Sequence, residues 1–341
     1  MAKKNIDWAN LSFEYQPTDM SYVSQWKDGV WDDGQLVADS NITLNECACV
    51  FQYAQTCFEG LKAYETVDGK VVIFRPDLNA QRLADSARTL EMAPVPEDKF
   101  IEAVKQVVKA NIDYVPPYGS GAALYIRPFE FGSSAVIGVA PADEYQFRIL
   151  VTPVGPYFKE GVKPIYIRVC DCDRAAPHGT GHIKAGLNYA MSLHNIVEAH
   201  KLGFAENMYL DAATRTYVEE TGGANFLFVT KDGKLVTPES DSILPSITRR
   251  SLMIVAEKYL GMEVEQRKVR FDEVKDFAEI GLCGTAAVIS PIGKINDHGT
   301  DIEVPSGMDE IGPVLGKLRE TLIDIQEGRL EAPEGWIVEI K

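Results

Sequence analysis

Residues 178–190 read HGTGHIKAGLNYA and hold one lysine, Lys184, among the glycines Gly179, Gly181 and Gly186, with no other Lys, Arg, Asp or Glu. Glycine has no Cβ, so a backbone rich in glycine can approach a ligand closely. A lysine that has few charged neighbours and is shielded from water loses affinity for its proton, as a Schiff-base amine requires. Lys184 is therefore a candidate nucleophile, and a solvated loop lysine is the alternative.

A second segment, TYVEETGGANFLFV, places two carboxylates before a pair of glycines and an apolar strand. One of them, Glu219 or Glu220, could face a pocket from the end of that strand. A carboxylate bound to a pyridine nitrogen keeps the nitrogen protonated, and the ring then accepts electrons from a substrate carbanion. A solvated acidic pair in a turn is the alternative.

Two further segments offer backbone N–H groups to an anion. In ILPSITRRSL, Ser246 can cap a helix that begins at Ile247, and the N–H groups of Ile247 and Thr248 then form an anion seat. In CGTAAVISP, Gly284 and Thr285 interrupt an apolar run as a turn between two strands would. A helix end that binds only water and an ordinary hairpin are the alternatives.

Two arginines lie in apolar surroundings, Arg82 in the helical RPDLNAQRLADSARTL and Arg127 in the strand-like ALYIRPFEF. Buried arginines usually have an anionic partner. Arg127 follows Tyr125 by two residues, so both side chains should lie on one face of the strand. A structural salt bridge is the alternative role for each arginine.

Hydrophobic periodicity predicts two mixed α and β domains, and 341 residues suffice for more than one core. The Pro- and Gly-rich stretch TPVGPYFKEG is the expected connector. We therefore expect a smaller N-terminal α/β domain at 1–151, a connector at 152–163 and a larger C-terminal domain with the lysine at 164–341. Predicted helices include residues 189–202 and 247–260 and a final amphipathic helix with the stripe Ile311, Leu315, Leu318, Leu322 and Ile325.

The net charge of −16 disfavours a polyanionic partner, because such a surface repels nucleic acid phosphates and anionic lipid. A small metabolite is the better partner class. The first residues, MAKKNIDWANLSF, lack an apolar run, so we expect neither a secretory signal nor a membrane anchor, and a cytoplasmic location. The six cysteines include no C-x-x-C, so reduced thiols are expected and a structural metal is not.

Together and in this order, the segments resemble the fold-type IV pyridoxal-phosphate enzymes, and most of all the bacterial branched-chain amino acid aminotransferases. The resemblance extends from about Phe13 to the final helix. It implies a two-domain α+β or α/β fold with the cofactor at the domain interface. Its most specific motifs are FEGLKAY (58–64), FRPDLNAQRL (74–83), LYIRP (124–128), KAGLNY (184–189), ETGGANFLFV (220–229), LPSITR (244–249) and GTAAVISP (284–291).

The resemblance implies pyridoxal 5'-phosphate as the cofactor and a role for each site residue. Lys184 forms the internal aldimine and moves the substrate proton. Glu220 rather than Glu219 faces the pyridine nitrogen, because it stands five residues before Asn225 as in the family motif. Tyr189 contacts the phenolic oxygen of the cofactor. The phosphate is held by Arg82, Ile247, Thr248 and Thr285.

The resemblance also implies the substrate site. Tyr125, with the backbone of Thr285 and Ala286, is expected at the α-carboxylate, and Arg127 with Tyr53 at the distal carboxylate of glutamate. The apolar wall consists of Phe13, Tyr53, Phe58 and Tyr189. The expected reaction is ping-pong transamination of Leu, Ile and Val with 2-oxoglutarate, which yields branched 2-oxo acids and L-glutamate.

Members of the family are homodimers, and the loop that approaches the neighbour's pocket corresponds here to Ile137, Gly138 and Val139. The mammalian members carry a C-x-x-C pair where this chain has Ala287 and Ser290. Within the fold, a D-amino acid aminotransferase or a pyridoxal-phosphate lyase is the rival hypothesis, and Tyr125 and Arg127 favour the branched-chain one. A non-catalytic metabolite-binding protein is the rival from another class.

Overall fold

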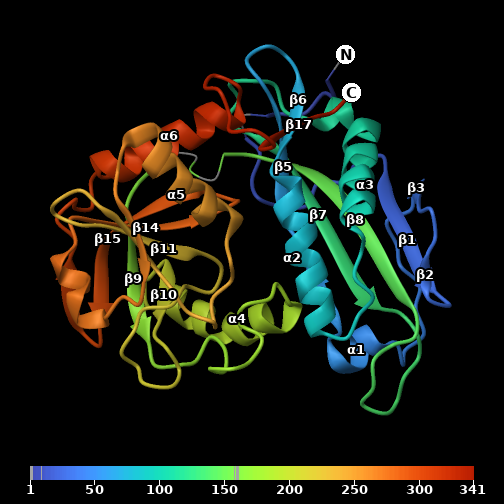
Figure 1. Ribbon diagram of the computed structural model, residues 1–341, viewed down its shortest axis with the longest axis horizontal. Helices are drawn as coiled ribbons and strands as arrows, with labels where there is room; N and C mark the ends of the chain where they lie inside the picture. The colour runs from blue at the N-terminus through green and yellow to red at the C-terminus, as the bar shows by residue number, and fades with distance from the viewer. Residues whose placement is uncertain (1–2, 9, 157, 159–160) are drawn as a thin grey trace. The chain divides into compact units, whose positions relative to one another are not determined.

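The computed structural model describes residues 3–8, 10–156, 158 and 161–341, drawn in Figure 1. The chain divides into two compact units. The first unit consists of Met1–Tyr157, Ile183–Gly186 and Ile325–Lys341, and the second of Phe158–His182 and Leu187–Asp324. Each unit has its own sheet and helices, in agreement with the mixed α and β fold predicted from the sequence.

The first unit is built on an antiparallel nine-stranded sheet in the order β17-β6-β5-β7-β8-β1-β2, with β3 paired to β1 and β4 paired to β7. Its elements are β1 (Ser21–Lys27), β2 (Val30–Trp31), β3 (Gln35–Val37), α1 (Cys49–Tyr53), β4 (Thr56–Phe58), β5 (Leu61–Glu65), β6 (Val71–Phe74), α2 (Pro76–Thr89), α3 (Glu97–Ala110), a 3-10 turn (Ile112–Tyr114), β7 (Ala123–Gly132), β8 (Tyr145–Val154) and β17 (Ile337–Glu339).

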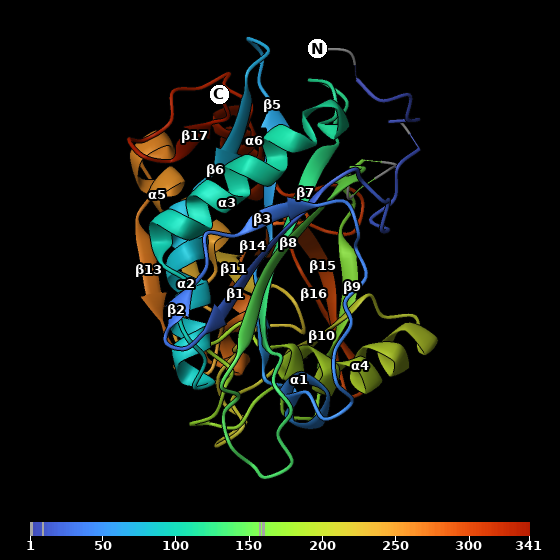
Figure 2. The same ribbon diagram turned by 90° about the vertical axis from the view of Figure 1, so that its right-hand side faces the viewer.

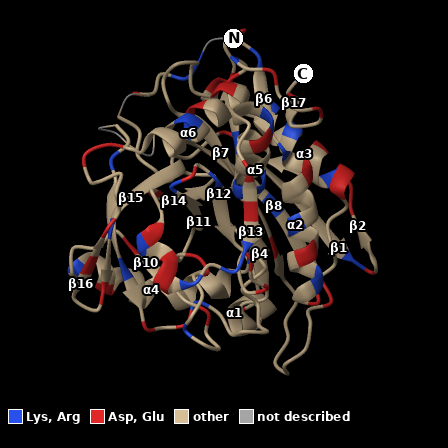
Figure 3. Cartoon of the chain, turned by 60° about the vertical axis from the view of Figure 1, so that its left-hand side comes forward, with Lys and Arg blue, Asp and Glu red and all other residues tan. Residues whose placement is uncertain are grey.

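Two helices pack on each other and on this sheet, α3 against β8 and β1 and α2 against β4, an arrangement that Figure 2 shows from the side. Pro76 stands at the start of α2, where the missing N–H costs no hydrogen bond, and Glu97 and Asp98 favour the start of α3 through its dipole. Figure 3 shows acidic and basic side chains mixed along both helices. Apolar residues of α3, such as Phe100 and Val104, are fully buried in the core of the unit.

The second unit is built on a mixed eight-stranded sheet in the order β10-β9-β15-β14-β11-β12-β13, with β16 paired to β15. Strand β9 runs parallel to both of its neighbours. Its elements are β9 (Ile165–Cys170), α4 (Gly186–Lys201), β10 (Glu206–Tyr209), β11 (Asn225–Val229), β12 (Leu235–Pro238), α5 (Ile247–Leu260), β13 (Val264–Arg267), a 3-10 turn (Phe271–Asp276), β14 (Glu279–Gly284), β15 (Val288–Asp297), β16 (Thr300–Glu303) and α6 (Pro313–Gln326).

Several local predictions are confirmed in this unit. Helix α5 begins at Ile247, and the Ser246 hydroxyl caps it by accepting from the N–H of Arg249. Gly261 ends the helix with a left-handed backbone at φ 63°. The stripe of α6 is buried at Leu315, Leu318, Leu322 and Ile325. Ile311 precedes the helix, which starts at Pro313.

The division between the units differs from a single boundary in the expected connector at 152–163. Residues 152–154 belong to β8, and residues 157, 159 and 160 lie outside the described part of the chain. Two later segments group with the first unit, Ile183–Gly186 and Ile325–Lys341. They do so because Ala185 bridges to Cys57 of β4 and because β17 pairs with β6. Lys184 is therefore fixed to the first unit.

A search of the helices in the described part of the chain finds none whose length and hydropathy would let it span a bilayer.

Candidate active site

Backbone hydrogen bonds hold Lys184 on two sides. Its N–H donates to the Oγ of Ser86 over 3.1 Å, and its carbonyl accepts from the N–H of Phe58 over 3.0 Å. Ser86 is fully buried on α2, and its hydroxyl in turn donates to the carbonyl of Arg82 over 2.9 Å. The half-buried Lys184 side chain places its Nζ 4.8 Å from the ring centroid of Phe58. The amine therefore extends from a backbone segment that cannot shift freely.

Four predicted substrate residues lie together near this lysine. The Arg127 guanidinium stacks 4.7 Å from the Phe58 centroid and donates to the Tyr125 hydroxyl over 2.9 Å. Phe13 packs edge-on against Tyr125 at 5.2 Å. Tyr125 fits because Gly60 lacks a Cβ, which would stand 2.3 Å from the Tyr125 Oη. We call this set, with Lys184, the aromatic–arginine cluster.

This cluster combines aromatic faces with one fixed positive charge. Aromatic rings accommodate aliphatic side chains by burial, whereas a guanidinium binds a carboxylate through paired donors. The chemistry of the cluster therefore suits both an apolar and an acidic side chain.

Arg82 makes a buried bidentate ion pair. Its Nε lies 2.7 Å from Oε1 of Glu59, and a terminal nitrogen lies 2.8 Å from Oε2. Asn79 also donates to Oε2 over 2.7 Å. The Arg82 and Glu59 side chains are 8% and 0% exposed. Arg82 thus has the structural salt bridge that was its alternative role, and its phosphate contact stays a prediction.

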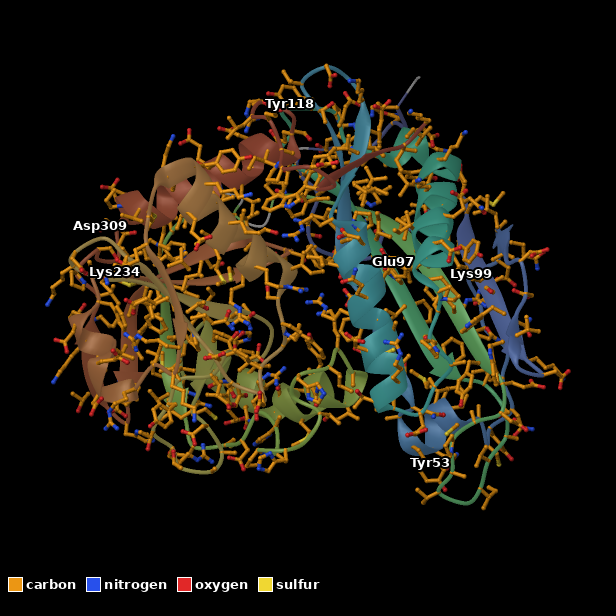
Figure 4. All side chains as sticks on the ribbon, in the orientation of Figure 1. Tyr53, Glu97, Lys99, Tyr118, Lys234 and Asp309 are labelled. Carbon is orange, nitrogen blue, oxygen red and sulfur yellow. The ribbon has the colours of Figure 1, made fainter. Side chains whose placement is uncertain are left out.

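Tyr53 ends α1, where Figure 4 labels it, and its hydroxyl donates to the carbonyl of Ile137. The loop that carries this carbonyl also contains Gly138 and Val139. Ile137 and Val139 are 75% and 90% exposed, which is unusual for aliphatic side chains. Tyr53 therefore has a defined contact with the loop that the family resemblance assigns to the dimer.

Glu220 is the centre of a buried polar cluster in the second unit. Its Oε1 accepts from Arg174 over 2.8 Å and from the backbone N–H of Leu244 over 3.0 Å, and its Oε2 accepts from Asn225 over 2.6 Å. Burial raises the pKa of Glu220 to about 7, against the opposing effect of the nearby Arg174. Glu219 instead accepts from Ser240 over 2.7 Å. The two neighbouring carboxylates thus have separate surroundings.

The remaining predicted residues of this unit lie at element ends. Ile247 and Thr248 are buried in the first turn of α5. Thr285 and Ala286 are half-buried in the turn between β14 and β15, which confirms the predicted hairpin. Tyr189 is half-buried on α4. These termini and turns present backbone N–H groups that can bind an anion.

Four residues of these clusters escaped the sequence reasoning: Glu59, Ser86, Arg174 and Arg249. Ser86 stands four residues after Arg82, so helical spacing alone could have placed both on one face of α2. Arg174 follows Asp173 in DCDRAAP, a pattern that reads as solvated charge, yet it is 4% exposed. Only tertiary contacts identify its partner as Glu220.

The residues present fit a phosphorylated pyridine aldehyde. Such a group needs an amine for its aldehyde, a carboxylate for its ring nitrogen and N–H donors for its phosphate. Lys184 supplies the amine, Glu220 the buried carboxylate and the start of α5 the donors. Within the described residues the buried Oδ1 of Asn225, beside Glu220, has no hydrogen-bond partner, as expected where polar groups surround a ligand.

Comparison with known proteins identifies the class. A family model described as amino-transferase class IV matches residues 56–295, which include both Lys184 and Glu220. A branched-chain-amino-acid aminotransferase of Haemophilus influenzae is 48% identical, with 99% of this chain and 100% of the relative covered. One of Helicobacter pylori is 44% identical, with 99% and 98% covered.

Solved structures agree. The branched-chain amino acid aminotransferase of Escherichia coli matches at a TM-score of 0.80 and 28% identity, with 95% of this chain and 100% of that chain covered. A thermophilic relative, the T.th. branched-chain amino acid aminotransferase with pyridoxamine 5'-phosphate, matches at 0.80 and 27%, with 96% and 100% covered. The chain therefore belongs to the branched-chain-amino-acid aminotransferases, pyridoxal-phosphate enzymes that exchange amino groups between branched-chain amino acids and 2-oxo acids.

Proposed function

We propose that the chain transfers the amino group of Leu, Ile or Val to 2-oxoglutarate by a ping-pong cycle, with pyridoxal 5'-phosphate bound covalently by Lys184. The observation that carries the proposal is the aromatic–arginine cluster, which sets Phe58 between the Lys184 amine and the Arg127 guanidinium. An apolar substrate side chain and the distal carboxylate of glutamate can each find a suitable surface there. The amine that reacts lies beside both.

Each assigned residue then has a defined task. Bound pyridoxal phosphate supplies an electron sink for the electrons of the substrate Cα–H bond. The Lys184 amine, once released by substrate, takes the α-proton, because a base already at the carbon transfers it most efficiently. The Glu220 carboxylate accepts from the pyridine N–H. Tyr189 donates to the phenolic oxygen, and Arg82, Ile247, Thr248 and Thr285 bind the phosphate.

The substrate is bound at both of its ends. We assign the α-carboxylate to Tyr125 and to the backbone of Thr285 and Ala286. We assign the distal carboxylate of glutamate to Arg127 with Tyr53, and the apolar wall to Phe13, Phe58, Tyr53 and Tyr189. Structures of the thermophilic relative with N-(5'-phosphopyridoxyl)-L-glutamate and with 4-methylvaleric acid support a site that takes both kinds of side chain.

We further propose a homodimer in which Ile137, Gly138 and Val139 lie near the neighbour's pocket. The pattern of α4 supports a partner, because polar residues of this helix are buried and apolar ones are exposed. Asn188 and Ser192 are 3% and 7% exposed, whereas Met191 and Leu193 are 58% and 62% exposed. Light scattering of the purified chain would test the assembly. The cytoplasmic location stays a prediction.

The decisive experiment combines a visible spectrum with turnover. The chain with cofactor should show an absorbance band that borohydride removes, with the label on Lys184, and should convert Leu with 2-oxoglutarate. Lys184→Ala should lose both properties and still fold, whereas Lys201→Ala, a surface lysine paired with Glu198, should keep them. Substantial turnover by Lys184→Ala would refute the assignment. Band without turnover would favour a binding protein, and turnover of D-isomers the rival aminotransferase.

A further inference from the structure

Arg174 links four segments of the second unit through one buried guanidinium. Its NH2 group lies 2.8 Å from Oε1 of Glu220. Its NH1 group donates to the carbonyls of Gly181 and Ser242, each over 3.3 Å. Gly181 permits this arrangement, because a Cβ there would stand 2.0 Å from the Ser242 carbonyl oxygen. The guanidinium is thus held by neutral acceptors on one side and is aimed at a single carboxylate on the other.

The surroundings of Glu220 make its charge state depend on this contact. Burial favours the protonated form of a carboxyl group, and an opposite charge favours the ionised form. The charged and titratable groups that face Glu220 are Arg174 after β9, Arg249 on α5, Cys283 on β14 and its neighbour Glu219. Burial raises the pKa of Cys283 to about 12, so this thiol stays neutral. Glu219 disfavours a second negative charge.

The two arginines are not equivalent. Only Arg174 makes an ion pair with Glu220, and it is the strongest of the groups that favour the ionised carboxylate. Arg249 donates its NH1 to the carbonyl of Pro238 over 2.6 Å and acts on Glu220 only through its charge. A contact between charged partners is both shorter and stronger than a neutral hydrogen bond.

We infer that Arg174 is a positioning residue that keeps Glu220 ionised and oriented, so that the carboxylate can hold a protonated pyridine nitrogen. The inference rests on the proposed role of Glu220 at that nitrogen. A protonated Glu220 would have no full negative charge to stabilise the pyridinium, and the ring would withdraw electrons less well. Arg174 acts through Glu220 and needs no contact of its own with the cofactor.

Unfolding of the cofactor-free chain as a function of pH tests this inference separately from activity. The pKa of Glu220 is raised on folding, so its contribution to stability is present below pH 4.5 and is lost as pH rises to about 7. Without Arg174 the carboxyl should resist ionisation further, and this loss should extend upward by about one to three pH units. Arg174→Gln should show the extended loss, and Arg174→Lys, which keeps the charge, should show a smaller extension.

Two comparisons separate charge control from a merely structural contact. Glu220→Gln should abolish the difference in pH profile between wild type and Arg174→Gln. Arg168→Gln is the matched control, because Arg168 is also bound in this unit but to Asn207 and to the Asn195 carbonyl. This control should shift stability equally at every pH. If Arg174→Gln does not fold, adding Glu220→Gln should restore folding, since no charge is then left unpaired.

The inference is overturned if Arg174→Gln lowers stability equally at all pH values, or if the double variant neither restores folding nor removes the pH effect. A second readout is pyridoxal phosphate binding by equilibrium dialysis, for which Arg174→Gln should raise the Kd at least tenfold and Arg168→Gln should not. Neither measurement requires turnover. Failure of wild type to transaminate would therefore refute the proposed function and leave these results interpretable.

Discussion

Glu130 offers a test of how burial controls charge behind the lysine segment. It lies on β7 opposite Cys57 of β4, and Cys57 in turn bridges to Ala185. The Glu130 side chain is 0% exposed, and within the described residues neither carboxyl oxygen has a hydrogen-bond partner. Burial raises its pKa well above 4.5. We expect Glu130→Met, which keeps a side chain of similar length, to stabilise the protein.

The size of the gain follows from two costs that the substitution removes. An unmet hydrogen-bonding group inside a protein costs about 1–3 kcal/mol. The second cost comes from ionisation: because the folded pKa is raised, the stabilising effect of the proton is present below pH 4.5 and is lost as pH rises through the folded value. Each pH unit across that window costs about 1.4 kcal/mol. Glu130→Met should therefore gain more at pH 8 than at pH 5.

Urea unfolding of the cofactor-free chain at pH 5, 6, 7 and 8 measures both effects. Glu130→Gln is the control, because an amide removes the titration and keeps the unmet polar group, so it should flatten the pH profile with a smaller overall gain. The reasoning fails if Glu130→Met destabilises the protein at pH 8, or if its profile runs parallel to that of wild type.

Other substitutions probe the lysine and substrate clusters. Gly60→Ala would place a Cβ 2.3 Å from the Tyr125 Oη and should break its contact with Arg127. We expect a roughly tenfold rise in KM for amino acids with normal cofactor content, because losing about 1.4 kcal/mol of binding is tenfold; an unchanged KM would contradict this. Ser86→Ala should cost about 1–3 kcal/mol in thermal unfolding, because the Lys184 N–H loses its acceptor. Glu59→Gln should cost about 3–5 kcal/mol, since it leaves the Arg82 charge buried without its ion pair; a change below about 1 kcal/mol would indicate that Arg82 has another strong partner.

Local patterns predicted what depends on neighbours in sequence. The Ser246 cap, the stop at Gly261 and the buried stripe of α6 follow from short-range rules, and each was confirmed. The spacing of Tyr125 and Arg127 likewise predicted a shared face of β7, and the two side chains are hydrogen-bonded. Chemistry read from such spacing is dependable because a strand or helix determines it.

Long-range pairings could not be predicted in this way. No local signal indicates that the lysine segment is joined to β4 rather than to its own flanks, or that Glu220 pairs with Arg174. The same holds for Glu130, which follows an apolar pattern in which a polar position reads as solvent-facing. Ion pairs and buried carboxyl groups are determined by the tertiary fold, so sequence spacing carries no information about them.

The clamped lysine segment has a consequence for how the chain is made. Residues 183–186 complete the first unit, but they are synthesised after part of the second, and the edge strand β17 is synthesised later still. The growing chain must therefore keep β6 without a neighbour on one side while the whole second unit emerges, and such an open strand invites pairing with other chains. Expression of residues 1–157 alone should accordingly yield aggregates rather than a folded half.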